Sequence, residues 1–169
     1  MAKKTKGGGG TPATKALVAA GVDYRDHPYE HDPSADSYGL EAAEAIGVPP
    51  EQVLKTLLAQ TDLARDHGLV VGIVPVTGQL DLKALAATVG AKKATMADPA
   101  LAEKTTGYVV GGISPIGQKR ALTTVLDESA TTHASVYVSG GRRGLDLELT
   151  PDDLVSVTGA TLAPIAKTS

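Results

Sequence analysis

The stretch TGYVVGGISPIGQKR, residues 106–120, joins an apolar pair of valines to two glycines and a Ser-Pro dipeptide. Gly111 and Gly112 carry no side chain, so their backbone amides can approach a ligand closely. Pro115 fixes its own φ angle and restricts Ser114 to extended conformations, which makes the loop stiff. Such a loop is typical of a binding site, although a plain glycine turn would have the same composition.

Outward from this loop, the chain alternates helical patterns with short apolar runs. Helices are predicted between a capping residue and a closing glycine: between Thr11 and Gly21, Ser37 and Gly47, Asp81 and Gly90, Asp98 and Gly107, and Thr150 and Gly159. Strands are predicted at residues 22–29, 53–60, 69–76, 108–110, 123–126, 136–138 and 147–149, the second and third forming an antiparallel hairpin. Clustered strands with irregularly spaced helices indicate a single α+β domain, a mixed and mostly antiparallel twisted sheet flanked by helices.

Length and composition limit the organisation of the chain. Its 169 residues suit one domain with one core, and no internal repeat is evident. Residues 1–10 hold lysines and four consecutive glycines, so we predict a disordered tail there and one folded domain over residues 11–169. No apolar run approaches the roughly 18 residues that a membrane span needs, and the start of the chain lacks a signal-peptide pattern. These features predict a cytoplasmic protein.

Residue usage also excludes several kinds of chemistry. The chain has no cysteine, which rules out disulfides, thiolate metal ligands and a cysteine nucleophile. Its four histidines are too scattered to predict a metal site. A Ser-His-Asp triad could be assembled on paper from Ser114, His31 and Asp146, but no G-x-S-x-G motif supports it. We therefore expect no metal and no cofactor.

Two further motifs hold candidate functional residues. In VLKTLL, residues 53–58, Lys55 lies among apolar neighbours. Lysine is rarely buried without a partner. The plainer explanation for a lysine among apolar neighbours is therefore a side chain with a buried stem and an amine exposed to solvent. SGGRRGLD, residues 139–146, has the glycines of a phosphate loop but lacks its Gly-Lys-Ser/Thr ending, which argues against a nucleotide triphosphate site. This motif predicts a hairpin turn.

Together with YEHD at residues 29–32 and the run at residues 75–81, these motifs resemble the YbaK family of aminoacyl-tRNA deacylases. The resemblance extends from about Thr11 to near the C-terminus. It implies the fold of the YbaK and prolyl-tRNA synthetase-associated editing domains, and trans-editing of mischarged tRNA, most closely Cys-tRNA(Pro). Two alternatives remain: a deacylase for Ala-tRNA(Pro) that uses water, and a non-catalytic module that binds a synthetase or tRNA.

The resemblance also implies a site. It makes Lys55 the residue on which activity most depends, with Tyr29 and Asp146 holding the aminoacyl group while the substrate's own thiol attacks its ester carbonyl. An ester carbonyl needs donors for its developing oxyanion, and the amides of the paired glycines are candidates. The positions expected to contact the substrate are Thr56, Gly111, Gly112, Ser114, Ser139 and Gly141.

Two basic dipeptides, Lys119-Arg120 and Arg142-Arg143, flank the two glycine-containing loops and are candidates for contact with the tRNA acceptor end. With a formal net charge of −3, the protein offers few positive groups to phosphates, so weak intrinsic RNA affinity is expected. We therefore expect prolyl-tRNA synthetase to act as the partner that supplies selection of tRNA(Pro), as the resemblance also implies.

Overall fold

The computed structural model describes residues 10–35 and 37–168, so the tail predicted at residues 1–10 lies outside it except for Gly10. The helices of the described chain are α1 Pro12–Ala20, α2 Tyr38–Ile46, α3 Leu82–Val89, α4 Pro99–Thr106 and α5 Pro151–Thr158. Each follows the predicted cap, whose side-chain oxygen accepts a hydrogen bond from the first turn, and each ends at a left-handed glycine. The predicted helices are confirmed. No helix in these two ranges is long and apolar enough to cross a bilayer.

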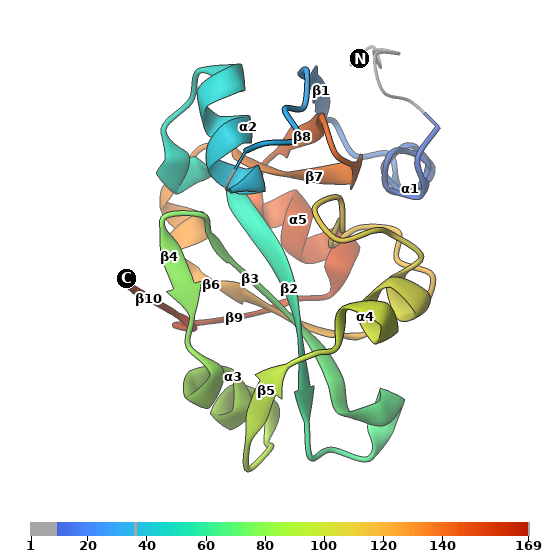
Figure 1. Cartoon of the computed structure of the whole chain (residues 1–169), viewed down its shortest axis with the longest axis vertical. Coiled ribbons are helices and arrows are strands. Elements are labelled where there is room, and N and C mark those ends of the chain that lie inside the picture. Colours follow the sequence, from blue (N-terminus) through green and yellow to red (C-terminus); the bar gives the residue numbers. More distant parts are fainter. Residues whose placement is uncertain (1–9, 36, 169) are drawn as a thin grey trace.

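A mixed five-stranded sheet crosses the middle of the molecule (Figure 1). Its order is β5-β2-β3-β6-β9, made of β5 Ala94–Met96, β2 Leu54–Thr61, β3 Leu69–Pro75, β6 Thr123–Asp127 and β9 Thr161–Ala163. The predicted hairpin of β2 and β3 is antiparallel, with Lys55 opposite Val74. Because β6 runs parallel to both β3 and β9, the sheet is mixed.

The other described strands form two smaller antiparallel sheets. One has the order β1-β8-β7, with β1 Arg25–Pro28, β8 Leu145–Leu149 and β7 Val136–Arg142, and the other pairs β4 Gly78–Leu80 with β10 Ala166–Thr168. Short 3-10 turns lie at Pro50–Gln52, Arg65–Gly68 and Glu128–Thr132. A single bridge between Val53 and Tyr137 connects the start of β2 to β7. The α+β class with mostly antiparallel strands is confirmed, but the strands divide among three sheets.

One predicted strand is wrong, and four short ones were not predicted. Residues 108–110 belong to the loop after α4, because Tyr108 is buried and its hydroxyl donates to the Ile116 carbonyl at 2.7 Å, folding the loop back on itself. The missed strands β4, β5, β9 and β10 have three residues each, too few to show an alternating pattern.

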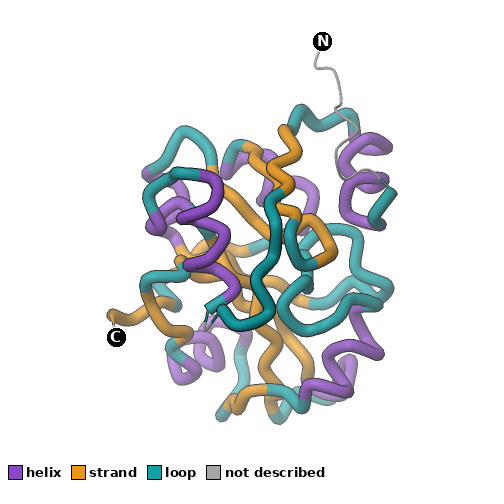
Figure 2. Tube along the Cα trace, turned by 45° about the horizontal axis from the view of Figure 1, so that its top comes forward, coloured by secondary structure: helices purple, strands orange, loops and turns teal. Residues whose placement is uncertain are grey.

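Aliphatic side chains fill both faces of the five-stranded sheet, since the chain has no Phe and no Trp. The larger cluster lies between this sheet and the β7–β8 hairpin and includes Leu58, Leu126 and Leu147. A second cluster, with Val70 and Leu85, lies under α3. The helices lie at the periphery of the molecule, and the strands of the five-stranded sheet pass through its middle (Figure 2). The start of β2 lies where α2, the hairpin and the loop after α4 converge.

Candidate active site

A pocket of about 420 Å³ lies at this convergence of β2, α2, the β7–β8 hairpin and the loop after α4. Its volume falls in the range of about 300–1,000 Å³ that small-molecule sites occupy. Tyr29, Lys55 and Asp146, the residues proposed for catalysis, all line it. Of the residues expected to contact the substrate, Thr56, Gly111 and Ser139 line it as well. Folding thus brings together four segments that are far apart in the sequence.

Lys55 and Thr56 supply polar groups to the pocket that have no partner within the described residues. The Lys55 side chain is half-buried, and desolvation lowers the pKa of its amine. No hydrogen bond or ion pair joins this amine to residues 10–35 or 37–168. The Thr56 hydroxyl is buried and likewise unpaired among these residues. An unsatisfied buried hydroxyl costs about 1–3 kcal/mol, which a ligand's hydrogen bond would offset.

Asp146 and Tyr29 are two further polar residues of the pocket lining. Asp146 is 6% exposed, and burial raises the pKa of its carboxyl to about 7. The pKa of Tyr29 rises to about 12, first through burial and then through the nearby charges of Asp146 and Glu41. The phenol therefore stays protonated at neutral pH and is available as a donor. Within the described ranges, the Asp146 carboxyl has neither a hydrogen bond nor a counter-ion.

The paired glycines do not have equal roles. Gly111 has a φ of +90°, lines the pocket, and has an amide without a hydrogen-bond partner among the described residues. Gly112 instead donates its amide to the Val109 carbonyl at 2.8 Å. A Cβ on Gly112 would lie 2.8 Å from the Cα of Arg142, so this glycine allows the loop to pack against the hairpin. Of the two predicted oxyanion donors, only Gly111 is available.

Ser114 and Gly141 do not line the pocket either, in contrast to the expectation from sequence. Ser114 is completely buried, and its hydroxyl accepts from the Ile116 amide at 3.2 Å, which stabilises the fold of the loop. Because Ser114 is buried in this way, it cannot serve as the nucleophile of a triad with His31 and Asp146. Gly141 has a φ of +107° at the irregularity in β7 and packs against Tyr108. The predicted hairpin turn is confirmed, and Gly141 supplies the positive φ angle at the irregularity in β7.

The basic dipeptides have different surroundings. Arg120 pairs with Asp66 in the turn between β2 and β3. Arg143 donates to the Val110 carbonyl beside the pocket, and the Arg142 guanidinium contacts the carbonyl of its neighbour at 3.3 Å. Each of these arginines therefore has an intramolecular partner. The described residues contain no group of three His, Asp or Glu side chains that could hold a metal ion.

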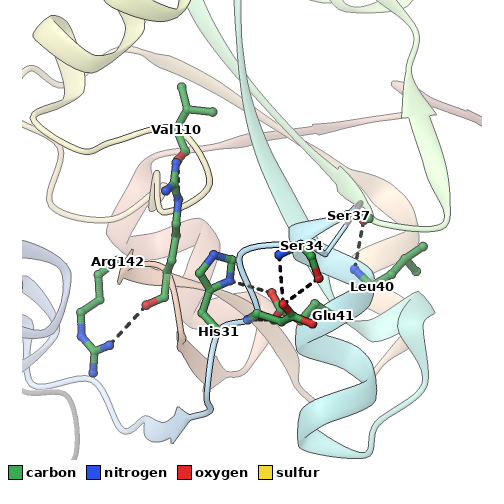
Figure 3. A network of polar contacts seen from close by, with 9 residues as sticks. His31, Ser34, Ser37, Leu40, Glu41, Val110 and Arg142 are labelled. Carbon is green, nitrogen blue, oxygen red and sulfur yellow. Dashed lines mark hydrogen bonds and ion pairs between the residues drawn. The ribbon is translucent and has the colours of Figure 1, made fainter.

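Sequence reasoning overlooked several residues around the pocket. Tyr38, the first residue of α2, lines the pocket, and its ring lies so close to Gly111 that a Cβ there would be 2.9 Å from Tyr38 Cζ. The scarcity of aromatic residues was the available signal, since the five tyrosines are the entire aromatic content of the chain. Glu41 was also missed: its carboxylate accepts from the Asp32 amide and contacts His31 Nδ1 at 2.9 Å (Figure 3). This contact fixes the segment that follows Tyr29.

The pocket thus offers a lysine amine, a buried carboxyl and a glycine amide without partners among the described residues, a set of groups that suits a small polar ligand. The family model for the aminoacyl-tRNA editing domain matches residues 32–157. A protein from Enterococcus faecalis named as a Cys-tRNA(Pro)/Cys-tRNA(Cys) deacylase, EbsC, is 37% identical over 156 residues, which are 92% of each chain.

Solved structures agree with the family match. The chain superposes with a TM-score of 0.80 and 26% identity on a structure described as a trans-editing enzyme for prolyl-tRNA synthetase, covering 92% of this chain and 95% of that one. A hypothetical protein gives a TM-score of 0.81 at 26% identity, covering 92% and 99%. The chain belongs to the aminoacyl-tRNA editing domain family. It is an aminoacyl-tRNA deacylase of the trans-editing type with tRNA as its substrate, and the resemblance to the YbaK family is confirmed.

Replacing Gly111 by alanine is expected to lower kcat for deacylation by about 100-fold, the effect of misplacing a catalytic group by about 1 Å. A Cβ at Gly111 would lie 2.7 Å from Arg143 Nε and 2.9 Å from Tyr38 Cζ, so the loop would have to move. Gly90→Ala is the matched control, because Gly90 has a φ of +82° but open space around its Cα. Equal kcat values for the two variants in single-turnover deacylation would contradict this role for Gly111.

Proposed function

We propose that the enzyme removes cysteine from Cys-tRNA(Pro) by a substrate-assisted mechanism. The composition of the pocket carries this proposal: within the described chain it is lined by a lysine and a carboxyl but by no histidine. A serine or threonine nucleophile needs an adjacent general base, and no basic side chain among the described residues hydrogen-bonds to Ser37, Thr56 or Ser139 of the lining. The nucleophile must then come from the substrate or from water. A cysteinyl ester supplies a thiol, and the name of the Enterococcus faecalis relative supports this substrate.

The unpaired polar groups fit the parts of a cysteinyl ester. The buried Asp146 carboxylate would pair with the α-ammonium group, which provides the counter-ion that it lacks. The Lys55 amine and the Gly111 amide would donate to the carbonyl oxygen as its negative charge develops. Tyr29 and Thr56 would hold the remaining polar atoms through their hydroxyls. In this arrangement the unpaired lysine, carboxyl, hydroxyl and amide of the pocket each gain a partner on the substrate.

The chemical step then needs no protein nucleophile. The thiol sulfur forms a bond to the carbonyl carbon, the ester bond from that carbon to the ribose oxygen breaks, and the thiol proton ends on this oxygen. Water hydrolyses the resulting thiolactone to free cysteine. The protein contributes binding, orientation and stabilisation of the oxyanion, and stabilisation of developing charge accounts for most of the rate enhancement in many enzymes.

We further propose that prolyl-tRNA synthetase supplies the selection of tRNA(Pro). The net charge of −3 means that the protein has no overall surplus of positive charge, and within the two predicted basic dipeptides Arg120 and Arg143 already have intramolecular partners. Each phosphate contact on a single strand contributes about 0.7 to the salt dependence of binding, so a site with few contacts binds weakly. The relative's name, which covers two different Cys-tRNAs, supports recognition of the aminoacyl group over the tRNA body.

The test is deacylation of Cys-tRNA(Pro), Cys-tRNA(Cys), Ala-tRNA(Pro) and Ser-tRNA(Pro), each with and without prolyl-tRNA synthetase. The isolated enzyme is expected to cleave both cysteinyl substrates at similar rates and to leave the seryl and alanyl esters largely intact. Addition of the synthetase is expected to favour Cys-tRNA(Pro). Faster cleavage of Ala-tRNA(Pro) would overturn the thiol mechanism, because alanine has no internal nucleophile. Strong preference of the isolated enzyme for tRNA(Pro) would overturn the role of the synthetase.

A further inference from the structure

Arg143 donates two hydrogen bonds to the loop that carries Gly111. Its Nε and Nη2 donate to the Val110 carbonyl at 3.0 and 2.6 Å, across 33 positions of sequence. A guanidinium group that donates two hydrogen bonds fixes the direction as well as the distance of its acceptor. The hairpin between β7 and β8 thereby holds the carbonyl immediately before the Gly111 amide.

The same peptide segment is held from its other side by α4. The Val110 amide donates to the Glu103 carboxylate at 2.8 Å. Both backbone polar groups of Val110 are therefore bonded to charged side chains, one from α4 and one from the hairpin. Hydrogen bonds in which one partner is charged are stronger than those between neutral groups.

An aromatic ring supports the guanidinium group. Arg143 Cζ lies 5.1 Å from the centroid of the Tyr38 ring, within the distance of a cation–π interaction. The Tyr38 ring lies 5.6 Å from the His31 ring, which contacts Glu41 at 2.9 Å. His31, Glu41 and Val110, which take part in these contacts, are labelled in Figure 3. These contacts connect the segment after Tyr29 with the loop that carries Gly111.

We propose that Arg143 is a positioning residue for the deacylation reaction: it holds the Val110 peptide so that the Gly111 amide points at the ester carbonyl. This inference rests on the proposed function of the pocket and replaces the expectation that Arg143 contacts RNA. Its guanidinium already makes two hydrogen bonds and a ring contact within the protein. Arg142, whose guanidinium makes one longer contact at 3.3 Å, is the better candidate for a phosphate.

The kinetic test compares Arg143→Ala, Arg143→Lys and Arg142→Ala in deacylation of Cys-tRNA(Pro). Arg143→Ala is expected to lower kcat by about 100-fold with little change in KM, because a misplaced donor weakens the transition state. Arg143→Lys keeps the charge but replaces the two planar guanidinium donors by a single ammonium group, so its kcat is expected to lie between those of Arg143→Ala and the wild type. Arg142→Ala is the matched loss of charge at the adjacent position, and its effect is expected in KM and in the salt dependence.

A second measurement needs no substrate and is independent of the proposed reaction. Amide hydrogen exchange in Arg143→Ala is expected to speed up by about 10-fold or more at Val110 and Gly112, whose amides are bonded to Glu103 and the Val109 carbonyl, while β2 remains protected. If exchange were faster in the variant but the wild-type enzyme did not deacylate Cys-tRNA(Pro), the positioning of Val110 by Arg143 would be retained and the proposed substrate rejected. Unchanged exchange, or a higher KM at normal kcat, would overturn the positioning role of Arg143.

Discussion

Deacylation by a Lys55→Ala variant is expected to fall about 100 to 1,000-fold in kcat, the loss that follows removal of one oxyanion donor. Lys55 lines the pocket, and its amine makes no hydrogen bond or ion pair within the described residues. Desolvation lowers the pKa of this amine, so the fold holds it at a cost that no internal contact offsets. Since no hydrogen bond or ion pair is lost and a desolvated charge is removed, the melting temperature should change little.

The measurement is single-turnover deacylation alongside thermal unfolding. Lys83→Ala is the matched control, because Lys83 is an exposed lysine on α3, which contributes nothing to the pocket lining. The control should retain full turnover. A Lys55→Ala variant that melts normally and still turns over at the wild-type rate would remove Lys55 from the mechanism and favour a non-catalytic explanation of the unpaired amine.

Replacement of Asp146 by asparagine is expected to stabilise the protein above pH 7 while it weakens catalysis. The buried carboxyl has a folded-state pKa of about 7, against an ordinary value of 3.8. Because the folded-state pKa is raised, the protonated carboxyl gives its full stability below pH 4, and this stability is lost as the pH rises through 7. The difference corresponds to about 4 kcal/mol at most in the free energy of unfolding. Asparagine carries no charge and avoids that loss.

Urea unfolding of both proteins at pH 4, 6 and 8 measures this effect. The two free energies of unfolding should nearly coincide at pH 4 and diverge as the pH rises, with the variant more stable at pH 8. Asp23→Asn is the control, since Asp23 is exposed and lies outside the pocket. Parallel pH profiles for the wild type and Asp146→Asn would show that the carboxyl is paired in solution. A stabilised variant with lower activity is typical of a residue kept for function.

Local patterns of residues were sufficient to predict the helices and the central hairpin, whereas the roles of the pocket residues came from the family resemblance. Each helix was predictable from a cap and a closing glycine, such as Ser37 and Gly47, because these signals act within one turn of chain. The β2–β3 hairpin followed from local apolar patterns for the same reason. Lys55 and Asp146 were identified through motifs that a family resemblance connects. Their presence in one pocket agrees with that identification.

Tertiary packing, in contrast, determines which polar groups are free. Gly111 and Gly112 look alike in sequence, yet the amide of Gly112 is bonded to Val109 while that of Gly111 is open to the pocket. Arg142 and Arg143 are likewise adjacent, and only the second reaches Val110, 33 positions away. Hydrogen bonds between distant segments depend on how the elements pack, and local residue patterns do not encode that packing. The same packing gives the Asp146 carboxyl its raised pKa, since burial is a property of the whole fold.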